Sequence, residues 1–526
     1  MRRRRTAEVD PTAQQDSALV VEGAPVPDAD VYESVRDSAE SSLTGKVVGG
    51  AAWSAIGRTS SQALQFLAGL ALARLLLPAD FGLLASVYVV TGFAVLFFDM
   101  GLNAALVHAR VLRRSDMDTA FWLNALGGIV FVGILAAVGP LVAEFYSDDR
   151  LRYITPLAGL SFAFALGTVH SALLTRRLKF KRLAVIETAA AVVGNSTTVV
   201  GALAGWGPLA LVAGPALQSI VLTTLMWIAS PWRPRGFIRR ASVRRLWSFS
   251  GGMLGFSLVN YAGRNSDNLL IGRILGAAPL GYYNRAYNLM LLPLQQISQV
   301  VGRVMFPALA SMGDDRARLQ RAYRRTVTVM TAVTMPVLVG MSAVADGLVP
   351  LLWGDQWGAT IPLLQVLCLA GLPQCLSSTE GWLYQSQGRT KLMFLMGGIS
   401  TAIGVAAIVI GLHWGLLGVT IGILTTAWAY QPIALRVACG LIGLRGSRVI
   451  LDILPTVVIA LVMGGAVYGA PVLLGVPRTE PLVLCGQILL GVLVYGALMF
   501  VFRRDVLREL ATLRPGRRRA GVQVAR

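Results

Sequence analysis

The sequence predicts an all-α polytopic membrane protein with about fourteen transmembrane helices in two pseudo-symmetric six-helix lobes plus two C-terminal helices. Composition is the first indication, because 55% of the 526 residues are hydrophobic, 14% are charged and the mean hydropathy is +0.63. A water-soluble protein of this length contains a larger share of polar and charged residues, because its surface must face water. Two further observations, an alternation of charge between loops and an internal repeat, support the same fold class.

Apolar segments recur along the chain after Gly45 with short interruptions. Each is long enough for the roughly 20 residues that a helix needs to cross the hydrocarbon core. We expect spans near residues 48–73, 81–106, 118–145, 151–175, 182–204, 208–229, 247–275, 280–306, 319–347, 361–386, 391–412, 416–436, 450–472 and 480–502.

Basic residues gather in every second loop, whereas the intervening loops are nearly free of them. Because Lys and Arg accumulate on the cytoplasmic side, both termini should be cytoplasmic in a plasma (inner) membrane. Net charge +20 therefore reflects topology, and we expect no nucleic-acid partner. The clusters include Arg110, Arg113 and Arg114 before the third span, Arg176, Arg177, Lys179, Lys181 and Arg182 before the fifth, and Arg316, Arg318, Arg321, Arg324 and Arg325 before the ninth.

An internal repeat relates Arg74–Gly82 (RLLLPADFG) to Arg273–Gly281 (RILGAAPLG), 199 residues later. Six spans separate the copies, so both halves enter the membrane in the same orientation, as in parallel repeats. The alternative is that such a turn is ordinary loop chemistry. The repeat predicts a six-helix lobe at 46–230, a second lobe at 231–440 and two additional helices at 441–503. Composition predicts a disordered cytoplasmic tail at 1–45 and a basic cytoplasmic tail at 504–526.

Catalytic and cofactor motifs are not evident. The three histidines are scattered, no Gly-rich loop ends in Gly-Lys-Ser/Thr, and no nucleophile–base arrangement can be assembled. The four cysteines lie in apolar stretches without metal-ligand spacing. We therefore expect no enzyme activity, no cofactor and no metal.

Polar residues at membrane depth are the candidates for function, because each is costly unless it faces a cavity or a partner. Arg58 in the first span and Arg264 in the seventh lie on polar helix faces, and guanidiniums suit an anionic group such as pyrophosphate. The alternatives are an Arg264–Asp267 ion pair and, for Arg285, snorkelling to headgroups. The substrate-binding candidates are Arg58, Arg264, Gln62, Gln65, Asn260, Asn268 and Arg285.

Four carboxylates within spans are candidates for binding a coupling proton or cation. They are Asp99, Glu187, Asp267 and Glu380. Asp99, Glu187 and Glu380 could equally pair with a loop arginine.

Several segments resemble the multidrug/oligosaccharidyl-lipid/polysaccharide exporter superfamily, and within it the polysaccharide transporter branch of oligosaccharide flippases. They are Ala73–Gly82 (ARLLLPADFG), Phe98–Leu106 (FDMGLNAAL) and Arg264–Gly281 (RNSDNLLIGRILGAAPLG). The resemblance implies two lobes around a cavity that opens alternately to each side. It also implies an undecaprenyl-pyrophosphate-linked oligosaccharide as substrate, with arginines that hold the pyrophosphate.

Three functions remain open at this point. The first is flipping a lipid-linked oligosaccharide for exopolysaccharide or cell-surface polysaccharide synthesis, with membrane lipids, a polysaccharide polymerase and glycosyltransferases as partners. The second is cation-coupled drug export, which would favour an acidic cavity. The third is a membrane glycan polymerase or ligase, although the external loops are short for a catalytic site.

Overall fold

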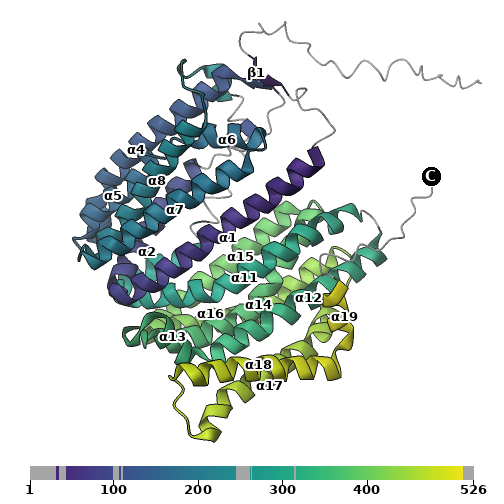
Figure 1. Cartoon of the computed structure of the whole chain (residues 1–526). Helices are drawn as coiled ribbons and strands as arrows, with labels where there is room; N and C mark the ends of the chain where they lie inside the picture. Colours follow the sequence, from purple (N-terminus) through teal and green to yellow (C-terminus); the bar gives the residue numbers. More distant parts are fainter. Residues whose placement is uncertain are drawn as a thin grey trace, which may run out of the picture.

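The computed structural model describes residues 31–34, 43–98, 106–107, 111–244, 261, 263–312 and 315–512. The described chain is almost entirely helical (Figure 1). The first lobe contains α1 (Leu43–Leu75), α2 (Pro78–Phe98), α4 (Arg114–Tyr146), α5 (Leu151–Ala163), α6 (Thr168–Arg176), α7 (Phe180–Leu203), the 3-10 turn η5 (Gly207–Leu209) and α8 (Ala210–Ala229).

The second lobe is described from residue 261 onward. It contains α10 (Ser266–Ile274), α11 (Ala277–Ser311), α12 (Arg316–Ala343), α13 (Ala345–Trp353), η6 (Asp355–Trp357), α14 (Thr360–Ser386), α15 (Thr390–Gly411), η7 (Leu412–Trp414) and α16 (Gly415–Gly440). The chain then continues into α17 (Gly446–Leu474), α18 (Pro481–Phe502) and α19 (Arg504–Thr512). These last helices pack along the second lobe, with α17 against α12 (Figure 1).

Within the described residues, nine helical segments are long and apolar enough to cross a membrane. One of them, Thr390–Gly440, contains both α15 and α16 and so corresponds to two expected spans. The predicted fold class is therefore confirmed, and the expected number of about fourteen spans is compatible with the helices seen.

The two lobes meet through α2 and α11, and the repeated segments lie at their crossing. A Cβ atom on Gly82 would overlap the carbonyl oxygen of Ala277, and one on Gly281 would overlap that of Pro78. The 199-residue offset relates Gly82 to Gly281 and Pro78 to Ala277. This contact is reciprocal, as expected for two parts related by a two-fold axis.

The lobes are joined at one end, which we call the closed end. Here Gln356 and Trp357 donate hydrogen bonds to the carbonyl oxygen of Ala73 near the end of α1, each at 2.7 Å. The helices of the two lobes converge toward this end and diverge away from it (Figure 1).

Two local features differ from the expectations. Val31–Ser34, inside the segment expected to lack regular structure, forms strand β1, which pairs antiparallel with β2 (Val111–Arg113). The fourth expected span is two helices, α5 and α6. The Thr223 hydroxyl of α8 donates to the carbonyl oxygen of Phe164 at 2.5 Å and accepts from the amide of Leu166 at 3.2 Å. The Leu166 amide also donates to the Phe164 carbonyl oxygen at 2.8 Å, so the Thr223 hydroxyl adds hydrogen bonds to a turn whose backbone groups already pair with each other.

Candidate functional site

The first lobe contains a cavity of about 380 Å³ between α1, α7 and α8, which we call the N-lobe cavity. Arg58, Gln62 and Gln65 reach it from one face of α1, and Glu187 reaches it from α7. Residues four apart on a helix share a face, which explains why Ser54, Arg58 and Gln62 line the cavity together. The structure thus brings together four of the residues proposed from the sequence.

Arg58 and Glu187 attract each other across the N-lobe cavity but form no ion pair in the described part of the chain. Gln62 has a partner in the other lobe, because its side-chain oxygen accepts a hydrogen bond of 3.4 Å from Gln296 of α11. The cavity therefore lies beside the boundary between the lobes.

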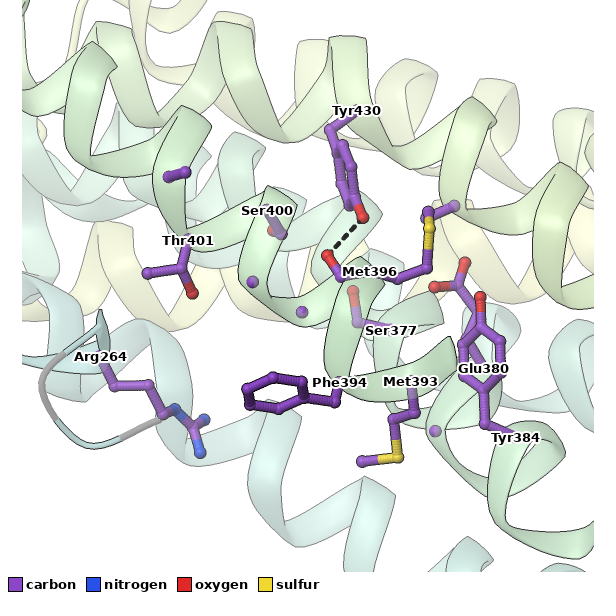
Figure 2. A pocket seen from close by; sticks show the side chains of 15 residues that line it. Arg264, Ser377, Glu380, Tyr384, Met393, Phe394, Met396, Ser400, Thr401 and Tyr430 are labelled. Atoms are coloured by element: carbon purple, nitrogen blue, oxygen red, sulfur yellow. Dashed lines mark hydrogen bonds between the residues drawn. The ribbon is translucent and has the colours of Figure 1, made fainter. Parts of the chain in front are cut away.

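The second lobe contains a cavity of about 480 Å³, which we call the C-lobe cavity (Figure 2). Arg264 lies on one side of it and Glu380 on the other, with Phe394 and Met393 between them. The 199-residue offset relates Arg264 to Gln65, which lines the N-lobe cavity. The two related positions therefore each line a cavity of their own lobe, but the side chains differ.

Glu380 is 5% exposed and has an uncharged partner. Its carboxylate accepts a hydrogen bond of 2.5 Å from the Gln431 amide, and the Gln431 oxygen accepts from Ser377 at 3.4 Å. In the described residues no ion pair joins Glu380 to a loop arginine. A carboxyl group in such surroundings can hold a proton or a cation.

Asp267 does not pair with Arg264 in the structure. It is 8% exposed, and its carboxylate accepts a hydrogen bond of 2.7 Å from the Tyr283 hydroxyl. The chain turns at Asn265 and α10 begins at Ser266, so the spacing rule for residues within one helix does not apply to Arg264. Asn268 is partly buried, and its side-chain oxygen has no hydrogen-bond partner in the described residues.

Arg285 lies in neither cavity, nor does it snorkel toward headgroups. Its guanidinium lies over the Phe81 ring, 3.9 Å from the ring centroid, with the rings of Trp353 and Trp357 about 6 Å away. These aromatic residues belong to both lobes at the closed end. The structure therefore gives Arg285 an interlobe packing contact.

Two proposed site residues, Asn260 and Asp99, lie outside the described residues. In the other direction, sequence reasoning overlooked Gln218 on α8 and Gln431 on α16. Each is an amide inside an otherwise apolar span, and the cost of an unpaired polar group at membrane depth could have pointed to both.

Paired lobes, each with a cavity lined by one arginine and one glutamate between membrane-spanning helices, define a polytopic membrane transporter. The family model for polysaccharide biosynthesis proteins matches residues 71–362, more than half of the chain. The chain belongs to that family, and the expected place in the polysaccharide transporter branch of the exporter superfamily is confirmed.

Named relatives are similar over most of their length. The lipopolysaccharide biosynthesis protein WzxC of Escherichia coli (strain K12) is 32% identical over 391 residues, which are 73% of this chain and 79% of that protein. The teichuronic acid biosynthesis protein TuaB of Bacillus subtilis (strain 168) is 27% identical over 396 residues, which are 75% of this chain and 81% of that protein.

Solved structures show the same fold. The lipid II flippase MurJ in an inward closed conformation has a TM-score of 0.68 at 15% sequence identity, covering 86% of this chain and 99% of that chain. An inward-facing multidrug resistance transporter of the MATE family has a TM-score of 0.56 at 15% identity, covering 72% of this chain and 95% of that chain.

Proposed function

We propose that the protein is a flippase that moves an undecaprenyl-pyrophosphate-linked oligosaccharide across the plasma membrane, for synthesis of an exopolysaccharide or a cell-surface polysaccharide. The observation that carries the proposal is the pair of arginines, Arg58 and Arg264, each lining a cavity with no ion-pair partner among the described residues. The names of WzxC and TuaB, which refer to the biosynthesis of cell-surface polymers, support it.

The physical problem of such a substrate is its charge. A pyrophosphate and a hydrated glycan cannot cross hydrocarbon unless a protein shields them from lipid. An unpaired guanidinium supplies planar, permanently charged donors that match phosphate oxygens. A carrier for cationic drugs would instead benefit from an excess of carboxylates, and the described residues of each cavity contain one Arg and one Glu.

Alternating access fits the arrangement of the lobes. The rule that Lys and Arg remain on the cytoplasmic side puts both termini in the cytoplasm. The closed end then faces outward, and the lobes diverge toward the cytoplasm, where a substrate made inside the cell would enter.

The change between the inward-open and outward-open arrangements of the lobes would be driven by an ion bound at one of the candidate carboxylates, Glu187, Asp267 or Glu380. A polysaccharide polymerase would receive the product, and glycosyltransferases would supply the substrate.

Deletion of the protein tests the proposed function. We expect lipid-linked oligosaccharide to accumulate in the cytoplasmic leaflet, measured by extraction of labelled glycolipid and by its protection from an enzyme added outside. Restoring the wild-type protein should clear the accumulated lipid. Unchanged precursor levels together with greater sensitivity to cationic dyes would support drug export instead. Translocated glycolipid that accumulates unpolymerised in the outer leaflet would support a polymerase.

A further inference from the structure

Most polar side chains of the N-lobe cavity have no hydrogen-bond or ion-pair partner among the described residues. In the described chain, Gln62 alone among them forms a hydrogen bond, to Gln296. The polar side chains without a hydrogen bond or ion pair to a described residue are Ser54, Arg58, Ser61, Gln65, Glu187 and Gln218. Polar groups gathered in one cavity without protein partners are available to a ligand.

The walls that carry these side chains are closely packed. A Cβ atom on Gly57 of α1 would lie 2.6 Å from the Cβ of Ala184 on α7. A Cβ atom on Gly194 of α7 would lie 2.6 Å from the Cβ of Gln218 on α8. The three helices therefore touch beside the cavity, and their close contact fixes the backbone from which the polar side chains project.

Apart from Arg58, the chemistry of this lining favours an uncharged part of a ligand that is rich in hydroxyl groups. Glu187 accepts hydrogen bonds, so it can bind the O–H groups of a sugar. Gln65 and Gln218 offer both donors and acceptors, which match the O–H groups and oxygens of a sugar. The C-lobe cavity differs, because Met393, Phe394 and Met396 supply much of its lining.

We infer that the N-lobe cavity is a glycan subsite, in which sugar hydroxyls bind to Glu187, Gln65 and Gln218. The inference rests on the proposed function and adds the part of the substrate that this cavity takes. The glycan is bonded to the pyrophosphate, so sugar-binding groups must lie close to a phosphate-binding one. Arg58 lines the same cavity and meets that requirement. The cavity volume of about 380 Å³ is within the range of small-ligand sites, roughly 300–1,000 Å³.

The test compares two ligands of the purified full-length protein. One probe is undecaprenyl pyrophosphate without sugar, and the other is the lipid-linked oligosaccharide extracted from the deletion strain. Gln65→Leu and Gln218→Leu should each weaken binding of the glycan-bearing lipid about tenfold, as losing a hydrogen bond to the ligand implies. Binding of the bare lipid should stay unchanged.

Two further variants make the result specific. Thr224→Val, on α8 outside the cavity lining, should bind both probes as the wild type does. Arg264→Ala should weaken both probes alike. Equal losses for both probes in the glutamine variants, or no loss for either, would overturn the glycan subsite while leaving the proposed function standing. Failure of the wild-type protein to bind either lipid would overturn the proposed function and the subsite with it.

Discussion

Arg264 is the residue whose surroundings changed most between sequence and structure. The sequence predicts that Arg264 lines a cavity, with an ion pair to Asp267 as the alternative. In the structure the chain turns at Asn265 before α10, and the Asp267 carboxylate accepts a hydrogen bond from the Tyr283 hydroxyl rather than pairing with Arg264. The guanidinium is exposed at the C-lobe cavity instead. A local spacing rule could not predict this, because Tyr283 belongs to the next helix.

Replacing Arg264 should weaken substrate binding and leave folding intact. Losing a hydrogen bond to a charged group costs about 1.5–3 kcal/mol, so Arg264→Ala should weaken substrate binding tenfold or more. Lys should restore only part of this, because it supplies charge without the planar guanidinium. Glycolipid translocation in vesicles and folded yield would be measured side by side.

The control for this prediction is Arg152→Ala, which removes an exposed arginine on α5 outside both described cavities. It should leave translocation unchanged. Full translocation by folded Arg264→Ala protein would remove Arg264 from substrate binding. A loss of folded yield that Asp267→Ala reverses would instead restore the ion-pair interpretation.

At the scale of helices, much of the architecture could be predicted from the sequence. Hydropathy locates long helices because crossing a bilayer requires an uninterrupted apolar segment. The break between α5 and α6 could not be predicted, because the Thr223 hydroxyl that hydrogen-bonds to the backbone there comes from another helix. The polar face of α1 was predictable from its helical period. The neighbours of that face, including Gln218, depend on how the helices pack.

A second prediction concerns the stability of the crossing between α2 and α11. A methyl group at Gly82 or Gly281 would overlap a backbone carbonyl, so Gly82→Ala and Gly281→Ala must force the two helices apart. Each should lower stability by about 1–3 kcal/mol, a typical cost of overpacking. Thermal unfolding of the purified protein would measure the loss.

The two substitutions act on one contact, so their effects should not add. The double variant should cost clearly less than the sum of the single variants. Gly133→Ala provides the matched control, because a Cβ atom at Gly133 on α4 would meet nothing within 4 Å. It should be neutral or stabilising, since Ala is favoured over Gly inside a helix. Additive losses, or a stable Gly82→Ala protein, would contradict direct contact of the two backbones.

At the scale of the whole molecule, the lobes define one closed end, and we propose its side of the membrane from the charges of the loops. The cytoplasmic assignment of both termini rests on the excess of Lys and Arg in alternate loops. It places the loops α4–α5 and α15–α16 outside, together with the closed end. The same assignment makes the open side face the cytoplasm, so the direction of transport depends on it.

Single cysteines test this topology in a background without Cys368, Cys375, Cys439 and Cys485. Asp149→Cys and His413→Cys place thiols at exposed positions in the two loops assigned outside, and neither residue has a positive φ that would strain a cysteine. Both should react with a membrane-impermeant thiol reagent added to intact cells. Arg240→Cys and Arg318→Cys should react only after the membrane is opened, because their loops carry the basic clusters. The reverse pattern would turn the closed end toward the cytoplasm, and the structure would then represent the state that releases substrate outside rather than the one that receives it.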